Sequence, residues 1–139
     1  VRAIHAIDSR IRVEQQACPL FVPLVEEGWF EHPAAELIAE EYLRSVRDAG
    51  IEALVLGCTH YPLLKPLLRR VVGLSVALID SAEQTALTVE RTLAEAGLTA
   101  PAGTPQHRFV VSDDEPRFRQ VGSRFIGERL VGAEVVPLG

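Results

Sequence analysis

A short apolar segment that ends in a glycine and is followed at once by reactive side chains constrains this chain more than any other feature. Residues 53–56 are apolar and favour a buried β-strand, which Gly57 would end. Pro62 suits the first turn of a helix and precedes an amphipathic segment over residues 63–72. A thiol, a hydroxyl and an imidazole lie between strand and helix, on Cys58, Thr59 and His60. The sequence therefore places reactive groups at the carboxyl end of a strand, where open α/β sheets bind ligands.

The rest of the chain alternates predicted strands with predicted helices. Further strands are expected over residues 11–16, 75–79, 107–111 and 133–136. Further helices are expected within residues 1–10, from Pro33 to the stop at Gly50, from Ser81 to Gly97, and over residues 116–130. Two Pro-bearing stretches, residues 18–25 and 99–106, are expected to be loops or broken turns. This order predicts an α/β fold with a mainly parallel sheet flanked by helices.

The start of the helix at residue 81 shows a capping pattern. Ser81 and Gln84 have the spacing of a capping box, in which each side chain bonds a backbone amide of the first turn. Asp80 adds negative charge at the positive end of the helix dipole. These residues are explained by local structure without any catalytic role.

Composition and charge limit the classes of function. The 139 residues suit one domain, with 47% hydrophobic and 24% charged residues. The net charge of −5, without a cluster of Lys and Arg, argues against nucleic-acid binding. No apolar run approaches the ~20 residues that cross a bilayer, so no membrane contact is expected. Two cysteines do not form a disulfide framework, and a reducing cytoplasm is the expected location.

Three separate motifs, in order, resemble those of bacterial glutamate racemase. The first is Ala-Cys-Pro-Leu-Phe-Val-Pro-Leu-Val-Glu over residues 17–26. The second is Gly-Cys-Thr-His-Tyr-Pro over residues 57–62, and the third is Asp-Ser-Ala over residues 80–82. The resemblance covers essentially the whole chain, but the family's chains are about twice this long. The sequence also starts at Val1 and contains no Met, so we expect it to be the C-terminal half of a longer protein.

The resemblance implies a cofactor-independent interconversion of L- and D-glutamate that supplies D-glutamate for peptidoglycan synthesis. One thiolate removes the α-proton while a thiol on the opposite face delivers another. By this resemblance Cys58 is one of the two thiols, and His60 and Glu26 assist it. Gly57 and Thr59 stand where donors to the substrate carboxylate are needed, although Thr59 could instead cap the following helix. No cofactor and no metal are expected.

The second cysteine, Cys18, is not expected to be the opposite base. In the family pattern its Cys-Pro position differs from both catalytic cysteines, so we interpret it as a buried structural residue. The family's other catalytic cysteine lies in a Cys-Asn-Thr motif of a first lobe, together with an Asp-Ser-Gly motif, and neither occurs in this sequence. The resemblance implies two lobes: residues 1–79 would form the second, and residues 80–139 would pack largely on the absent first lobe. The chain alone is therefore expected to be inactive as a racemase.

Several alternatives remain open at the level of sequence. A related racemase could act on aspartate or hydantoins. Cys58 and His60 could form the nucleophile and base of a cysteine hydrolase, or could join Cys18 and His32 as metal ligands, although zinc sites usually show tighter pairs. A non-catalytic half-protein that assembles through exposed faces is the non-enzymatic alternative. We expect glutamate as the small-molecule partner and a homo-oligomer as the state in solution.

Overall fold

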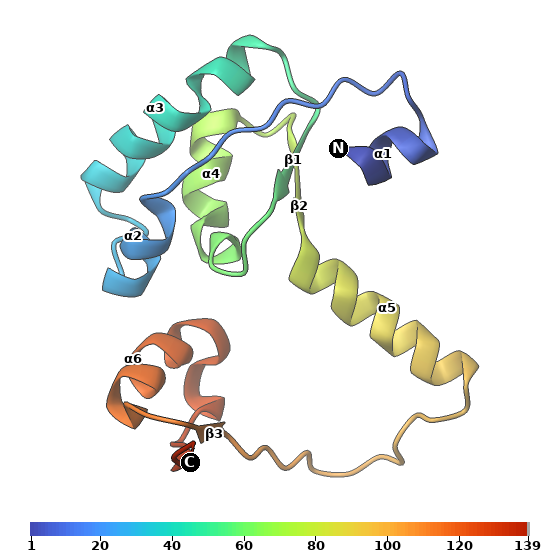
Figure 1. Cartoon of the computed structure of the whole chain (residues 1–139), viewed down its shortest axis with the longest axis vertical. Helices are drawn as coiled ribbons and strands as arrows, with labels where there is room; N and C mark the ends of the chain where they lie inside the picture. The colour runs from blue at the N-terminus through green and yellow to red at the C-terminus, as the bar shows by residue number, and fades with distance from the viewer. Residues whose placement is uncertain (139) are drawn as a thin grey trace.

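A computed structural model describes residues 1–138 and has the shape of an open ring (Figure 1). A compact body contains α2 (Phe21–Glu27), α3 (Pro33–Asp48), α4 (Lys65–Val72) and the strands β1 (Ala53–Leu56) and β2 (Ala77–Asp80). The helix α1 (Arg2–Ile7) precedes this body. The long helix α5 (Ser81–Glu95) leaves the body after β2. The chain then returns to the body through β3 (Val110–Val111), α6 (Glu115–Ile126) and β4 (Glu134–Val135).

The predicted α/β class is confirmed, and all strand pairs are parallel. β1 pairs with β2 in a register that sets Leu56 beside Asp80. β3 pairs with β4, so the strands form two separate two-stranded sheets rather than one. In β1 and β2 the alternate residues Ala53, Val55, Ala77 and Ile79 are exposed. The first sheet is therefore covered on one face by the helices of the body and uncovered on the other.

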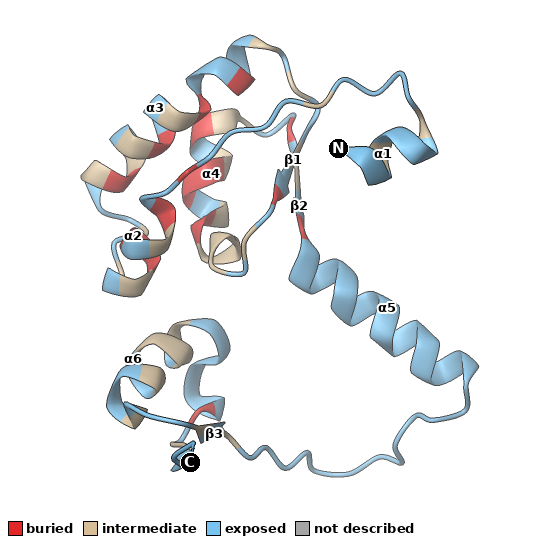
Figure 2. Ribbon diagram, viewed as in Figure 1, coloured by how far each residue is buried: buried red, intermediate tan, exposed pale blue. Residues whose placement is uncertain are grey.

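The core lies between α2, α3, α4 and the inner face of the first sheet (Figure 2). Phe21 is 2% exposed and lies at its centre, with ring centroids 5.5 Å from Tyr42 and 5.3 Å from Tyr61 in edge-to-face geometry. Leucines from the turn after β1 and from α4 are buried beside it, Leu64, Leu67 and Leu68. The segment that carries Cys58 and His60 is thus anchored to the core on both sides.

Two predictions for the first half of the chain are wrong. Residues 11–16 form no strand but run extended, and among the described residues no neighbouring strand completes a ladder there. The expected loop over residues 18–25 contains most of α2 instead. Its Pro23 lies in the first helical turn, where the missing N–H group is not needed. Burial of Phe21, Leu24 and Val25 stabilises a helix that the two prolines concealed.

The other predicted elements are found with shifted ends. α3 begins at Pro33 after the His32 ring, which accepts a hydrogen bond from the Ala34 amide at 3.1 Å. The segment after β1 starts as a short 3-10 helix, Tyr61–Leu64, before α4. The predicted helix over residues 116–130 ends at Ile126, because Gly127 has a positive φ and a short 3-10 turn, Gly127–Arg129, follows.

The predicted capping box at residue 81 does not form. Asp80, whose backbone is extended, is the N-cap, and its carboxylate accepts the Glu83 amide hydrogen at 2.7 Å. Asp80 is 3% exposed and also pairs with Lys65 of α4, which lies 3.2 Å from Glu83. This cluster joins the end of β2, the start of α4 and the start of α5, and so sets the direction in which α5 leaves the body.

α5 makes little contact with the rest of the chain. Every residue from 81 to 108 is exposed, and Figure 2 shows the helix pale along its whole length. The chain exposes 10187 Å² in total, whereas a compact folded monomer of its 15.2 kDa mass would expose about 7,100 Å². Much surface that a compact fold would bury is therefore exposed.

Among the described residues, no helix is long and apolar enough to cross a membrane.

The Asp80 cluster predicts a pH dependence of stability. The Glu83 amide and the Lys65 ammonium lower the pKa of Asp80 below its usual range. Asp80 therefore stabilises the fold above the pKa of an unfolded Asp, about 3.9, and this contribution is lost as pH falls through the lower pKa of the folded state. We expect the urea midpoint of Asp80→Asn to be lower than that of the wild type at pH 7, and this difference to shrink between pH 4 and pH 2.

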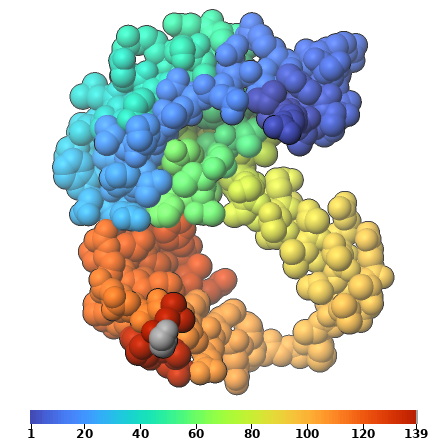
Figure 3. All heavy atoms as spheres, viewed as in Figure 1, coloured from blue at the N-terminus to red at the C-terminus, as the bar shows by residue number. Residues whose placement is uncertain are grey.

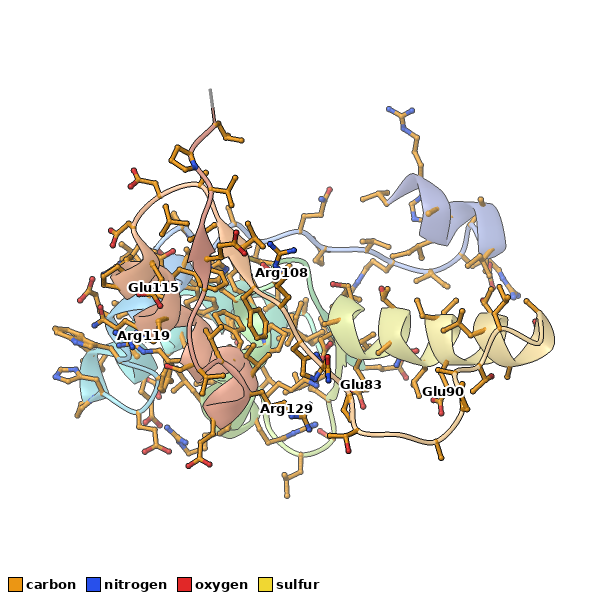
Figure 4. The ribbon with its side chains drawn as sticks, turned by 90° about the horizontal axis from the view of Figure 1, so that it is seen from below. Glu83, Glu90, Arg108, Glu115, Arg119 and Arg129 are labelled. Atoms are coloured by element: carbon orange, nitrogen blue, oxygen red, sulfur yellow. The ribbon has the colours of Figure 1, made fainter. Side chains whose placement is uncertain are left out.

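The matched control is Glu90→Gln, which removes an exposed carboxylate of the same helix, away from the cluster (Figure 4). Its urea midpoint should follow that of the wild type at each pH. An Asp80→Asn difference that stays constant from pH 7 to pH 2 would contradict the assignment.

Candidate functional site

The predicted strand, turn and helix around Cys58 are present. β1 ends at Leu56, and the turn behind it is closed by a hydrogen bond from the Tyr61 amide to the Cys58 carbonyl at 3.2 Å. Because β1 and β2 are parallel and in register at their ends, Cys58 lies at the same edge of the sheet as Asp80. The candidate site is therefore at the carboxyl edge of the first sheet, as the sequence predicts.

His60 lies between Cys58 and Glu26, with one ring nitrogen toward each. Its Nδ1 atom is 4.0 Å from the Cys58 sulfur and 3.4 Å from the Thr59 hydroxyl. Its Nε2 atom is 3.5 Å from Oε1 of Glu26. The structure thus brings together three predicted site residues, Cys58, His60 and Glu26, the last from a helix more than 30 residues earlier in the chain.

Glu26 lies near the carboxyl end of α2 and is shared between two partners. Oε1 faces His60, and Oε2 accepts a hydrogen bond from Arg117 of α6 at 3.3 Å. The neighbouring Glu27 points to the same guanidinium, at 3.7 Å, but has no contact with His60. The family resemblance assigned Glu26, with Glu27 beside it making that assignment less sharp, and it is Glu26 whose carboxylate lies 3.5 Å from the His60 ring.

The other two predicted site residues lie at the surface beside Cys58. Gly57 and Thr59 are both exposed, and no atom lies within 4 Å of a side chain built on Gly57. Thr59 does not cap the following helix, because its hydroxyl bonds His60 and neither that 3-10 helix nor α4 has a side-chain cap. That alternative is wrong. Substrate binding by the two residues stays a prediction.

Cys18 has the environment of a structural residue. Its side chain is 7% exposed within the core, and burial raises the pKa of its thiol. Its carbonyl accepts a hydrogen bond from the Tyr61 hydroxyl at 3.2 Å, which ties the segment before α2 to the segment after Cys58. The prediction that Cys18 is buried is confirmed.

The α6 side chains that reach this site were not predicted. Arg117, Arg124 and Phe125 contact residues that precede them by 65 to 99 positions. The sequence predicted only that residues 116–130 form a helix, and no local pattern indicates which distant residues such a helix contacts. Sequence reasoning alone could not have found these contacts.

The arrangement supports proton transfer or nucleophilic attack by Cys58. An imidazole beside a thiol can exchange protons with it, and a carboxylate on the far nitrogen orients the ring. Within residues 1–138, no three His, Cys, Asp or Glu side chains gather where they could hold a metal ion. His32, one of the four suggested ligands, instead caps α3 and stacks on Trp29 at 4.3 Å.

No family model matches this chain. The chain is 50% identical over 138 residues to a glutamate racemase of Syntrophus aciditrophicus and 50% identical over 139 residues to one of Neisseria meningitidis serogroup B. Each alignment covers 99% of this chain and 51% of the relative. The chain therefore spans about half the length of these curated relatives, and it matches their C-terminal half.

Solved structures give the same result. The glutamate racemase of Francisella tularensis, in complex with D-glutamate, superposes with a TM-score of 0.86 and 37% identity, over 97% of this chain and 51% of that one. The glutamate racemase of Thermus thermophilus, in complex with beta-chloro-D-alanine, superposes with a TM-score of 0.79 and 46% identity, over 88% of this chain and 47% of that one. At these identities the likeness extends from fold to sequence.

The two free thiols are predicted to react at different rates. Cys58 is half-buried beside His60, whereas Cys18 is buried and its raised pKa disfavours the thiolate. We expect iodoacetamide to label Cys58 about tenfold or more faster than Cys18 at pH 7.5. Mass spectrometry of the native chain over time measures both rates.

Matched single variants separate the two thiols in this experiment. Cys58→Ser should lose the fast phase and Cys18→Ser should keep it. Equal rates at the two cysteines in the folded chain would overturn the assignment of Cys18 as a buried structural thiol.

Proposed function

We propose that this chain supplies one of the two thiol half-sites of a cofactor-independent glutamate racemase. The observation that carries the proposal is the Cys58–His60–Glu26 arrangement at the carboxyl edge of a parallel sheet, in a chain that is similar over its whole length to glutamate racemases. The product D-glutamate would serve peptidoglycan synthesis in the cytoplasm.

In the proposed reaction the Cys58 thiolate takes the α-proton from one face of glutamate. The electron pair of the broken C–H bond moves toward the α-carboxylate. A second thiol on the opposite face gives its proton to the α-carbon, which completes the inversion. His60, held by Glu26, would exchange a proton with Cys58 between turnovers. Gly57 and Thr59 would bind the carboxylate, where negative charge develops.

In this proposal the second thiol comes from outside residues 1–139, since Cys18 is buried in the core. We propose that the other half of the full-length enzyme forms a first lobe that supplies it. Residues 1–79 would be the second lobe, and residues 80–139 would pack largely on the first. The ring has a wide hole between the body, α5 and the C-terminal unit, by which we mean β3, α6 and β4, and this hole leaves room for such a lobe (Figure 3).

Exposed apolar side chains support this division. Ala82, Ala86, Val89 and Leu93 recur at helical spacing on one side of α5, and the last two are 50% and 40% exposed. The uncovered face of the first sheet adds Val55 and Ile79, which are 59% and 39% exposed. Surfaces of this kind are normally covered in a folded protein.

The proposed half-site predicts proton exchange without inversion. In D₂O, we expect the chain to exchange the α-proton of one glutamate enantiomer, because one base is present and its opposite partner is not. Cys58→Ser should reduce this exchange rate at least about a hundredfold, because a positioned acid or base usually accelerates a reaction by about that factor or more. ¹H NMR of separate L- and D-glutamate samples measures exchange, and chiral chromatography measures inversion.

A chimera provides the control for an incomplete site. The C-terminal half of the Neisseria meningitidis relative would be replaced by this chain, and the chimera should racemise glutamate in both directions while its Cys58→Ser variant does not. A folded chimera that racemises neither enantiomer would contradict the proposed function. Inversion by the chain alone would show that a second thiol is present, from Cys18 or from another copy.

The exposed apolar faces predict self-association of the chain on its own. We expect light scattering to give a mass above that of a monomer at high protein concentration, with the α5 stripe among the buried surfaces. Val89→Glu with Leu93→Glu should lower the average mass. Leu74→Glu is the matched control, because Leu74 is 87% exposed at a turn outside these faces. A monodisperse monomer at every concentration would contradict the prediction.

A further inference from the structure

The helix α6 contacts the site from the opposite end of the chain. Three of its side chains reach α2 and His60, although the chain between them runs out along α5 and back (Figure 1). These contacts join the C-terminal unit to the two residues beside Cys58. Each of the three acts on a different part of the Glu26–His60 pair.

Arg124 holds the backbone of α2. Its guanidinium donates to the Val25 carbonyl at 2.9 Å and also to the Glu26 carbonyl. These are last-turn carbonyls of α2, where the negative end of the helix dipole lies, and the Val25 carbonyl also accepts the Gly28 amide at 3.0 Å. A side-chain carbon on Gly28 would lie 3.0 Å from the guanidinium, and Gly28 has a φ of +78°, so glycine both ends the helix and leaves space for Arg124.

Arg117 holds the Glu26 side chain. It donates to Oε2 at 3.3 Å while Oε1 faces His60 at 3.5 Å. A carboxylate that has partners on both oxygens has few alternative rotamers. Arg117 therefore orients the oxygen that faces the imidazole, and it balances the charge of Glu26 and of Glu27 at 3.7 Å.

Phe125 packs against the His60 ring, the other member of the Glu26–His60 pair. Its ring centroid lies 5.4 Å from that of His60 at an interplanar angle of 89°. This edge-to-face contact limits the rotation of the imidazole. The neighbours of the imidazole are then Cys58 and Thr59 on Nδ1, Glu26 on Nε2, and Phe125 against the ring.

We propose that Arg117 and Arg124 are positioning residues that hold Glu26 against His60, so that the C-terminal unit controls the geometry beside Cys58. This proposal rests on the proposed function for its catalytic meaning, but the geometry it predicts can be tested without activity. If residues 80–139 pack on a first lobe, α6 is also the element that links that lobe to the acid–base pair of the second. Arg117 and Arg124 would then make the pair sensitive to how the lobes meet.

The test is an NMR measurement on the full 139-residue chain with matched arginine variants. Nuclear Overhauser cross-peaks between the His60 ring protons and the Glu26 and Phe125 side chains report the geometry directly. In Arg117→Gln we expect the His60–Glu26 cross-peak to fall at least twofold. Arg124→Gln should weaken both cross-peaks, because α2 and α6 lose their shared anchor. Arg117→Lys, which keeps a cation, should restore the Glu26 cross-peak.

Arg119→Gln is the control for loss of an arginine from α6. Arg119 lies 3.7 Å from Glu115 on its own helix, where Figure 4 shows both side chains, and it is more than half exposed. In Arg119→Gln the cross-peaks from the His60 ring to Glu26 and Phe125 should match those of the wild type. Unchanged cross-peaks in Arg117→Gln and Arg124→Gln, with circular dichroism showing an intact fold, would overturn the proposal, as would equal losses in Arg119→Gln or no recovery in Arg117→Lys.

The same variants, placed in the chimera, separate positioning from substrate binding. Arg117→Gln should lower kcat about fivefold or more and leave KM within about twofold, because the contact is with the acid–base pair and not with glutamate. A change confined to KM would overturn the proposal. If the chimera itself were inactive, the proposed function would fail while the cross-peaks would still decide the geometry.

Discussion

The parallel hydrogen bonding that sets Leu56 beside Asp80 brings two distant sequence motifs to one edge of a sheet. On β1 the chain continues into the turn that carries Cys58 and His60. On β2 it continues into Asp80, which caps α5 and pairs with Lys65 at the start of α4. Every later feature depends on this edge, because the cap directs α5 outward and thereby determines where the chain must turn back. The turn that carries Cys58 and His60 is anchored at both ends, because Leu56 before it and Leu64 after it are buried in the core.

The elements that depend on a few neighbouring residues could be predicted from the sequence. The apolar run before Gly57, the proline after His60 and the His32–Pro33 helix start each act within a few residues, and each forms nearly as expected. The two wrong predictions in the first half of the chain have a common physical cause. Helix α2 forms despite Pro23 because Phe21, Leu24 and Val25 are buried in the core, where Phe21 packs against Tyr42 and Tyr61. Residues 11–16 form no strand because a strand needs a partner. Tertiary contact overrode local propensity in both cases.

The residues of the candidate site also differ in whether local sequence or tertiary contact determines them. Cys58, Thr59 and His60 are adjacent in sequence. Glu26 was identified only through the family resemblance, since one of two adjacent glutamates after an expected loop has no physical signature of its own. Arg117, Arg124 and Phe125 could not be predicted at all, because no spacing relates α6 to α2 across more than 90 residues. A sequence thus reveals the reactive group of a site more readily than the groups that hold it in place.

The solvent exposure of the site residues limits the chemistry that this half of the proposed active site can carry out alone. Glu26 and His60 keep 38% and 25% of their side chains exposed, and Thr59 and Gly57 are open to solvent. Electrostatic stabilisation of a developing carbanion is weak where water remains, and strong only where a second surface excludes it. A thiol on an open sheet edge can therefore exchange protons slowly, whereas racemisation requires an opposing surface that supplies both the second proton and the dry environment. If the proposed first lobe covers the exposed apolar faces of α5 and of the first sheet and also supplies this opposing surface, then closing the fold and completing the site would be one event.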